Sequence, residues 1–428
     1  MYRKWVLFFI LAVIMMILVL PVMSAASDVT TIQYAFWGNP ASLGVESDII
    51  AEFEKAYPHI KVEPIAVGYN DYHTKLLTLI AGGQAPDVMR LDSFYFADFM
   101  RVKALKDITK LVKRDHINVK AYYQAGLVDS MYKGRYYGLP WSTAPYYMVI
   151  NLKMFKDAGI AVPQNDWKWN DFIKISKALT KGKGIERQYG FADDFQMFHL
   201  LPWIWGEGGD IFDKSRTKFT LNNKAAVNRI QQLADLCKQD VFPDPAQFPT
   251  AEVLNRWMVN NKVAMRIGSA LELISLQNVK DFEFEVLPFP GGSVSASTTI
   301  FKSNTVGISA STKKAEAAWT FLKFLRAPGT RGEVLYMQAR RMPPTVDNPE
   351  LWKIFADPTK SPRKIAEVTQ VCASKYGHAL PLRTGWLEIQ GLLNPEIQMV
   401  FAGQKSASEA MKEIAPKVNE VMERTEKQ

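Results

Sequence analysis

The pattern of hydrophobic and polar positions between residues 30 and 92 changes period several times. Residues 30–37 (TTIQYAFW) alternate between larger apolar and smaller or polar side chains, which predicts a strand, and a Gly-Asn-Pro turn follows. The next elements are predicted as a helix at 49–57, a strand at 61–67, a helix at 71–83 and a strand at 86–92. Strands and helices that alternate with short connections predict a parallel sheet covered by helices. Pro64 marks the second strand as an edge strand or a bulge.

Similar patterns recur beyond residue 160, and no internal repeat or low-complexity linker separates them from the first set. Apolar residues at helical spacing in 167–182 predict a helix with Asn170 as its N-cap. Further helices are predicted at 221–239, 251–261 and 313–328, strands at 262–269, 282–290 and 299–309, and a C-terminal helical region with a break at Pro416. The sequence therefore predicts two α/β lobes with several crossings of the chain between them.

Residues 138–151 (GLPWSTAPYYMVIN) place Trp141, Tyr146 and Tyr147 among two prolines and small hydroxyl residues. We interpret the stretch up to Tyr147 as a loop and the apolar residues after it as a strand. Loops beyond the strand ends of such sheets are where ligands bind, so this segment is a candidate connector between lobes. The residues alone leave open whether its aromatic rings form core, a metal site or a ligand platform.

Residues 1–26 have the features of a signal peptide: a basic start, an apolar run and a small-residue cleavage pattern at Ser24 and Ala26. Ser27 is then the first residue of the mature protein. The alternative is an uncleaved membrane anchor, although the run is shorter than the ~20 residues that a span needs. No cysteine lies near the cleavage region, which argues against a lipid anchor there and favours a periplasmic location.

Composition and charge narrow the function classes. The 428 residues are 48% hydrophobic and 22% charged, which is typical of a globular protein with two domains. The formal charge of +9 is spread along the chain without a dense basic tract, so nucleic-acid binding is not favoured. Cys237 and Cys372 are the only cysteines. An oxidising compartment allows a disulfide between them, but Cys237 shares a helical face with apolar residues and is more simply a buried core thiol.

Motifs of catalysis are missing from the sequence. None of the five histidines has metal-ligand spacing, and no nucleophile elbow, phosphate-binding loop or dinucleotide fingerprint is present. We therefore predict no metal, no cofactor and no enzymatic activity. A carboxylate pair for glycan hydrolysis has no sequence signature and stays open. A ferric site at Tyr146 and Tyr147 lacks a supporting cluster of histidines and carboxylates.

The region after the signal peptide resembles, from end to end, the family 1 extracellular solute-binding proteins of ABC importers, the group that includes maltose-binding protein. Each matching stretch is weak alone, but their number, order and spacing carry the resemblance. They are IQYAFWGNP, AEFEKAYPHIKVE, YHTKLLTLIAGGQAPDV, GRYYGLPW with the following YY and N, KALTKG with YGFA, GEGGDIF, NNKVAM, AAWTFLKFL with AP, RRMPPT and AGQKSASEAM.

The resemblance implies an α/β, two-lobed periplasmic binding-protein fold (type II-like), each lobe a mainly parallel sheet flanked by helices and joined by hinge strands. Lobe 1 would comprise residues 27–145 and 303–343, and lobe 2 residues 146–302 and 344–428. A monomer would bind a carbohydrate between the lobes and deliver it to the transmembrane subunits of an ABC permease. A chemoreceptor is an alternative partner, and nucleic acid is not expected.

The family also suggests which residues contact the ligand, and each has an alternative role in the core or on the solvated surface. The candidates are Trp37, Asn39, Tyr72, Asp92, Ser93, Trp141, Ser142, Thr143, Phe198, Trp203, Ser269, Phe301, Lys302, Arg341 and Trp386. Tyr146 and Tyr147 are predicted to pack at the hinge. Phe301 and Lys302 stand where family members have small residues, which suggests that one of them reaches the ligand.

Two other functions remain open. Arg266, Lys302, Arg341 and Arg383 are predicted near the ligand, and arginine binds carboxylate or phosphate with two parallel bonds. An anionic ligand such as a uronic-acid oligomer or a glycerol phosphodiester is therefore one alternative to a neutral sugar. A secreted glycan-cleaving enzyme with a similar aromatic site is the other, and it would need paired carboxylates that face the ligand.

Overall fold

The structure is a computed structural model that describes residues 29–38, 40–270, 272–277, 279–340, 343–355 and 361–426. The predicted signal peptide and the candidates Asn39 and Arg341 lie outside the described residues. The strands are β1 (Thr30–Trp37), β2 (Ile60–Val67), β3 (Val88–Leu91), β4 (Met131–Tyr132), β5 (Arg135–Tyr136), β6 (Gly138–Asn151), β7 (Met265–Ser269), β8 (Phe284–Leu287), β9 (Thr299–Ile308) and β10 (Gly377–His378).

Helices surround these strands. In chain order they are α2 (Pro40–Ala56), α3 (Tyr69–Ala81), α4 (Ser93–Arg101), α5 (Thr109–Arg114), α6 (Gln124–Leu127), α7 (Leu152–Asp157), α8 (Trp169–Leu179), α9 (Met197–Trp205), α10 (Lys224–Lys238), α11 (Ala251–Val259), α12 (Leu273–Gln277), α13 (Ala315–Arg326), α14 (Arg331–Arg340), α15 (Pro349–Phe355), α16 (Ile365–Val371), α17 (Trp386–Phe401) and α18 (Ala407–Glu426). None of the helices that the structure describes combines the length and the apolar character needed to span a bilayer.

The parallel sheet predicted at the start of the chain is confirmed. β1 pairs in parallel with β2 and with β3, and α2 and α3 form the connections. The strand order is β2-β1-β3-β9-β6-β7, which places β2 at an edge. An edge strand tolerates a residue without a backbone N–H, and this explains Pro64. Trp37 and Leu91 end β1 and β3 on the same edge of the sheet.

Our interpretation of residues 138–147 as a loop is wrong, because all of 138–151 forms the single buried strand β6. The prolines weaken the local strand signal, but both are accommodated. The register of β6 against β9 shifts between Pro140 and Ser142, and the carbonyl of Pro140 accepts a hydrogen bond of 2.9 Å from Arg326 Nε. Tertiary pairing therefore overrides the turn-like composition.

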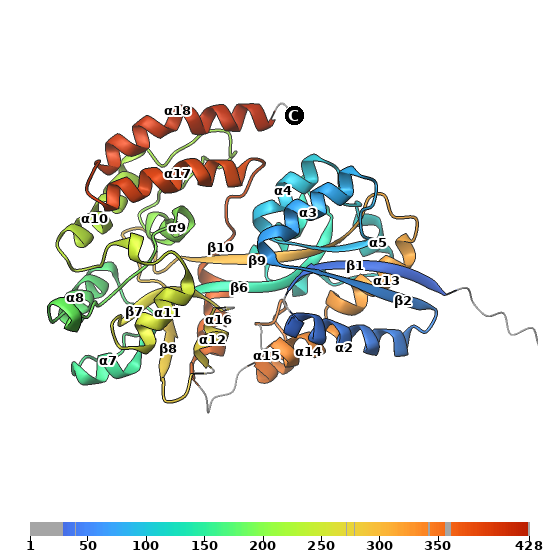
Figure 1. Ribbon diagram of the computed structural model, residues 1–428, viewed down its shortest axis with the longest axis horizontal. Coiled ribbons are helices and arrows are strands. Elements are labelled where there is room, and N and C mark those ends of the chain that lie inside the picture. The colour runs from blue at the N-terminus through green and yellow to red at the C-terminus, as the bar shows by residue number, and fades with distance from the viewer. Residues whose placement is uncertain are drawn as a thin grey trace, which may run out of the picture.

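β6 and β9 run from one lobe into the other (Figure 1). Residues 138–145 of β6 pair with β9, whereas Tyr146 and the residues after it pair with β7 and β8. The change of partner falls between Pro145, opposite Phe301, and Tyr146, opposite Ser269. The pairs of β6 with β7 and β8 are antiparallel, so in the second lobe the parallel pairs are the short pair of β9 with β10 and isolated bridges such as Tyr189 to Val263.

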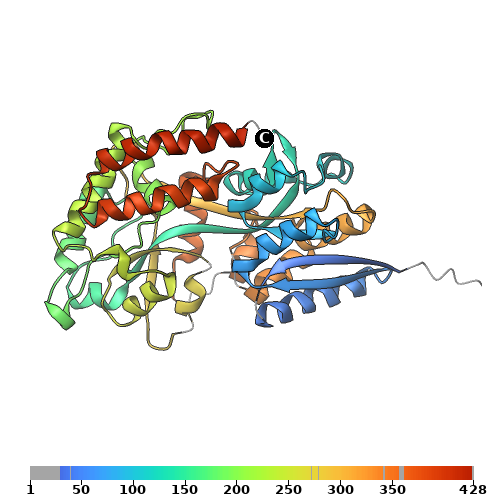
Figure 2. The same ribbon diagram turned by 45° about the horizontal axis from the view of Figure 1, so that its top comes forward.

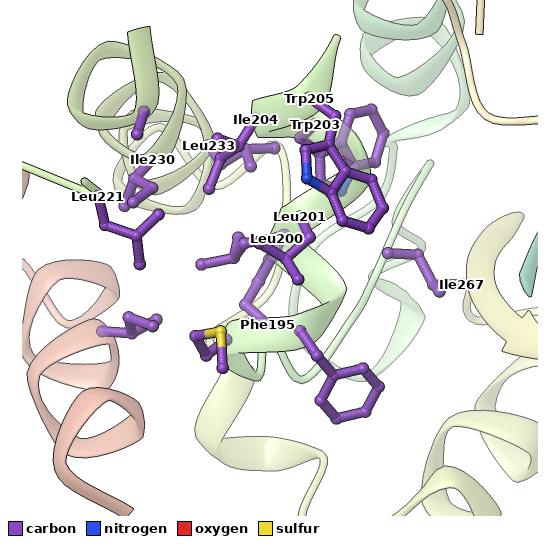
Figure 3. Close-up of a cluster of buried hydrophobic side chains, with 14 of the residues drawn as sticks. Phe195, Leu200, Leu201, Trp203, Ile204, Trp205, Leu221, Ile230, Leu233 and Ile267 are labelled. Carbon is purple, nitrogen blue, oxygen red and sulfur yellow. The ribbon is translucent and has the colours of Figure 1, made fainter. Parts of the chain in front are cut away.

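The buried hydrophobic residues form two large clusters. Residues such as Ile32, Phe53 and Trp319 are buried together in the first lobe, which carries β1, β2, β3 and α13. In the second lobe, α17 and α18 lie side by side (Figures 1 and 2), and α9 packs with α10 around Ile204 and Leu233 (Figure 3). The two-lobed α/β fold is confirmed, with the long strands as its connection.

Two local predictions for the helices of the second lobe are wrong. Lys168, not Asn170, is the N-cap of α8, because the Asp171 carboxylate accepts a 2.9 Å hydrogen bond from the Lys168 backbone N–H. Pro416 does not break the last helix, since α18 continues through it. Proline costs one helical hydrogen bond, but burial of side chains on both sides of it keeps the helix intact.

Both cysteines are free thiols. Cys372 is buried with Tyr147 and Val368 in a core cluster that extends into the first lobe, and Cys237 is partly buried against the core of the second. Burial raises the pKa of both thiols, so neither is a reactive thiolate near neutral pH. The simpler expectation of a core thiol at Cys237 therefore holds in part, since its side chain is only partly buried.

Candidate functional site

The end of β1 places Trp37 in an aromatic cluster. Its ring centroid lies 5.8 Å from that of Tyr69, 5.6 Å from Tyr72 and from His73, and 5.5 Å from Trp141. Tyr69 is exposed and Trp37 partly exposed, whereas the other three are buried. The exposed edge of this cluster is an apolar surface of the type that stacks on sugar rings.

The end of β3 places Asp92 beside Lys302 of β9. Lys302 Nζ lies 2.7 Å from Asp92 Oδ2, and the Tyr69 hydroxyl donates to the same oxygen at 3.3 Å. Asp92 Oδ1 accepts from the Phe94 backbone N–H, while His73 Nε2 accepts from the Asp92 backbone N–H. The ammonium of Lys302 also lies 4.3 Å from the Phe94 ring centroid. Asp92 and Lys302 therefore neutralise each other at the edge of the first lobe.

Phe94 connects this edge with the second lobe. Its ring centroid lies 5.5 Å from Phe198 of α9 and 6.4 Å from Trp386 of α17. Farther along α4, the Asp98 carboxylate accepts a 3.3 Å hydrogen bond from the Gly385 backbone N–H. The predicted residues Asp92, Lys302, Phe198 and Trp386 thus meet around Phe94, and we call this region the lobe junction.

His199 of α9 is held by two carboxylates on the second-lobe side of the junction. Its Nδ1 lies 2.8 Å from Asp194 Oδ1 and 3.2 Å from Asp193 Oδ2. Burial alone lowers the pKa of His199, but Asp193 and Asp194 outweigh it and raise the pKa well above its usual value. The ring packs 4.3 Å from Phe198 and 5.5 Å from Tyr146, and its Nε2 has no partner among the described residues.

The same three side chains could offer ligand atoms to a metal ion, since these atoms lie within 4.8 Å of one another. The short contacts from Nδ1 to both carboxylates are those of a charge-assisted hydrogen bond, in which Nδ1 carries the proton. A bound cation would have to replace that proton. The geometry therefore fits an ion pair better than a metal site.

A third ion pair lies close by on the second lobe. The predicted residue Ser269 donates a 2.9 Å hydrogen bond to Glu272 Oε1, and the guanidinium of Arg266 pairs with the same carboxylate. Arg266 is 1% exposed and also donates to the Ile267 carbonyl, so the N–H groups of its guanidinium are already bound within the protein. The charges of Glu272, Asp194 and Asp92 all act on the Tyr146 phenol, which lies among the three pairs.

Several predicted residues are packed within the lobes. The Trp141 ring, 5% exposed, lies 3.8 Å from the Arg90 guanidinium. The Tyr72 hydroxyl donates to the carbonyls of Ala35 and Arg90, and Thr143 donates to that of Pro344. Ser142, Trp203, Phe301 and Trp386 are buried as well. Their contact with a ligand stays a prediction, as does the hinge role of Tyr146 and Tyr147.

A cavity of about 1320 Å³ also lies between the lobes. Its walls are α4 and residues 128–133 of the first lobe, and residues 215–216, 380–384 and the end of α18 in the second. Of the predicted ligand contacts only Ser93 lines it, together with Arg383 from the basic residues predicted near the ligand. The lobe junction and this cavity are therefore neighbouring but different surfaces.

Comparison with known proteins decides the family. Residues 41–331 match the family of bacterial extracellular solute-binding proteins. The chain belongs to this family. An uncharacterized lipoprotein of Streptomyces antibioticus is 25% identical to this solute-binding protein over 300 residues, which are 68% of this chain and 65% of the relative. The sn-glycerol-3-phosphate-binding periplasmic protein of Pectobacterium atrosepticum is 23% identical over 431 residues, 94% of each chain.

Among solved structures, an ABC substrate-binding protein of Listeria monocytogenes in complex with cycloalternan is similar to this solute-binding protein. Its TM-score is 0.80 at 26% identity, and the match covers 92% of this chain and 99% of that one. The family and the shared fold give this protein a substrate-binding role, as the sequence predicted. The family is one of binding proteins, not of enzymes.

The sequence reasoning missed Tyr69, Phe94, His199 and Glu272 at the junction. Tyr69 lies outside the predicted helix, which begins at residue 71, whereas α3 begins two positions earlier at Tyr69 itself. The sequence does contain a signal for His199. The adjacent aspartates Asp193 and Asp194 precede it by six and five positions, just before the start of α9. Glu272 follows the predicted Ser269 by three positions and had no signal of its own.

Asp129, which lines the cavity, should make stability depend on pH. Burial raises its pKa to about 7, although the Ser303 backbone N–H donates to Oδ2 at 2.9 Å. Between the unfolded and folded pKa values the folded protein binds the extra proton, so stability falls as pH rises from 5 to 8, by about 2–3 kcal/mol. Asp129→Asn should remove this part of the decline, as melting temperatures of both proteins across the range will measure. Parallel declines would contradict the assignment.

Proposed function

We propose that this solute-binding protein binds a neutral, hydroxyl-rich ligand, a sugar or oligosaccharide, at the lobe junction. The observation that carries the proposal is that each cation there is already paired with a carboxylate: Lys302 with Asp92, His199 with Asp193 and Asp194, and Arg266 with Glu272. Paired carboxylates keep lone pairs that accept from hydroxyl groups, while none of these cations remains unpaired to bind an anionic ligand. Aromatic rings beside them supply stacking surfaces.

Specific residues are assigned to ligand contact in this proposal. Trp37 and Tyr69 stack from the first lobe and Phe198 from the second, because all three lie at the junction. His199 donates through Nε2, since a buried polar atom is nearly always hydrogen-bonded and this one has no partner among the described residues. The cycloalternan complex of the Listeria protein supports a saccharide as the ligand class.

Binding would close the two lobes by a hinge motion. We assign residues 27–145 and 303–343 to one lobe and 146–302 and 344–428 to the other, with Tyr146 and Tyr147 at the hinge. The change of partner along β6 at Tyr146 supports this division. A hinge absorbs its dihedral changes in a few residues between rigid parts.

The partner in this proposal is the permease of an ABC importer, to which a periplasmic monomer delivers the ligand. A chemoreceptor is a second partner that would recognise the same closed form. No bond of the ligand is broken. A general acid must hold a proton, and the junction carboxylates instead hold cations, which supports binding and not hydrolysis.

A thermal-shift panel tests the proposal. Neutral mono- and oligosaccharides, uronic-acid oligomers and glycerol phosphodiesters should be compared at low and high salt. We expect a neutral saccharide to raise the melting temperature equally in both, because a ligand that binds only the folded state stabilises it. A salt-sensitive response to acidic compounds alone would favour the anionic-ligand alternative, and release of shorter sugars from an oligosaccharide would indicate an enzyme.

Trp37→Ala should weaken binding of the saccharide found in this panel by about tenfold, through loss of the stacking surface. Isothermal titration calorimetry measures the change. Tyr189→Ala is the matched control, since Tyr189 stacks on Trp257 in the second lobe. An unchanged affinity in Trp37→Ala would remove this residue from the ligand site.

A further inference from the structure

The cavity between the lobes is richer in basic than in acidic side chains. The basic residues on its walls are Arg101, Lys103, Lys106, Lys133, Arg216 and Arg383, and the acidic ones are Asp107, Asp129 and Glu426. Two of the acids are already engaged: Asp107 pairs with Arg135, and Asp129 accepts from a backbone N–H. This surface therefore differs from the lobe junction, where Lys302, His199 and Arg266 are each paired with a carboxylate.

Two arginine side chains on the second-lobe wall are held by backbone carbonyl groups. Arg216 Nη1 donates to the Leu382 carbonyl at 2.7 Å, and Arg383 Nη1 donates to the Arg216 carbonyl at 2.8 Å. Arg383 Nη2 donates to the Met422 carbonyl. Neither arginine forms an ion pair with a described carboxylate. Glu426 acts electrostatically on Arg383, and Arg216 acts on Asp129, but neither interaction is an ion pair.

The segment that carries Arg216 is built to hold this position. The Asp213 carboxylate accepts hydrogen bonds from the backbone N–H groups of Thr217 and Lys218, at 2.7 and 2.9 Å. Arg216 itself has a φ of 59°, a left-handed conformation that costs energy for a residue with a side chain. Strain of this kind persists where the surrounding structure enforces it, often at binding sites.

Unpartnered buried polar atoms belong to lining residues of both lobes. Ser93 Oγ on the first lobe and Arg383 Nε on the second have no hydrogen-bond partner among the described residues. Opposite the arginines, Lys103 and Lys133 are exposed and form no ion pair within the described chain. Lining residues of both lobes therefore carry donors, and basic side chains outnumber acidic ones on this surface.

We infer that this cavity is a second ligand site, which binds a compound with two or more carboxylate or phosphate groups. Arg216 and Arg383 bind one anionic group from the second lobe, and Lys103 and Lys133 bind another from the first. The volume of about 1320 Å³ admits a ligand larger than a single phosphate. The site is independent of the saccharide proposed for the junction, because none of Trp37, Tyr69, Phe198 and His199 lines the cavity.

Calorimetric titration with inorganic pyrophosphate and with citrate tests the inference on the full mature protein. We expect one of them to bind, and Arg216→Gln to raise its Kd by about tenfold or more. Because Arg216→Gln removes a bond to Leu382, the pair Lys103→Gln with Lys133→Gln provides a second variant at exposed positions of the other lobe. The same loss of affinity is expected there.

The matched control is the pair Lys174→Gln with Lys177→Gln, two exposed lysines of α8 that remove the same charge far from the cavity (Figure 1). Equal weakening in the control would mean general charge attraction and overturn the inference, as would absence of binding by both probes. Saccharide binding is measured separately in each variant. Its failure would contradict the function proposed for the junction and leave the anion result standing.

Discussion

Replacing Arg90 by methionine should lower the free energy of unfolding by about 3–5 kcal/mol, because it leaves a buried carboxylate without its partner. Arg90 and Glu46 are each 1% exposed and form an ion pair in the first lobe. Arg90 Nη2 also donates to the Tyr34 hydroxyl at 2.7 Å, and the guanidinium lies 3.8 Å from the Trp141 ring centroid. Chemical denaturation of the wild-type protein and the variant measures the loss.

The double variant Arg90→Met with Glu46→Gln distinguishes a lost ion pair from lost packing. It removes both charges, so it should recover part of the stability that the single variant loses. If both variants are equally unstable, packing of the Arg90 side chain against the aromatic rings, and not the charge, stabilises this region. If Arg90→Met is as stable as wild type, the buried pair has no role in stability.

His199→Phe should weaken binding of the neutral saccharide by a factor on the order of ten to a hundred. Phenylalanine keeps a ring against Phe198 and Tyr146 but removes the Nε2 donor, and a hydrogen bond from a charged group contributes about 1.5–3 kcal/mol. Calorimetry gives the affinity, and the melting temperature shows whether the variant folds.

His199→Gln is the matched variant, since its amide N–H can replace the donor without the charge, and it should retain part of the affinity. In wild type the affinity should not change between pH 6 and 8. Asp193, Asp194 and Tyr146 face the imidazole, with Arg266 acting on Asp194, and the two carboxylates keep the pKa of His199 well above its usual value. Full affinity in His199→Phe would show that Nε2 binds water instead of ligand.

Whether the position of a site residue could be predicted depends on how far along the chain its partners lie. Trp37 and Asp92 follow strands of a parallel sheet, so their common edge could be predicted from the order of elements alone. The partner of Asp92 is Lys302, 210 positions along the chain, and no local pattern links the two. The three ion pairs that favour a neutral ligand became visible only with the fold.

By itself, the sequence determined the two-lobed α/β fold and the elements from β1 to β3, because alternation and helical spacing are properties of neighbouring residues, and the resemblance of its short motifs to the solute-binding proteins indicated the family. Only the tertiary structure decided that residues 138–151 form one strand through both lobes. Their prolines read as a loop locally, and pairing with β9, β7 and β8, more than a hundred positions away, overrides that signal. Tertiary structure likewise placed Trp141 against Arg90, since burial and charge pairing depend on every segment that surrounds a residue and not on its neighbours in sequence.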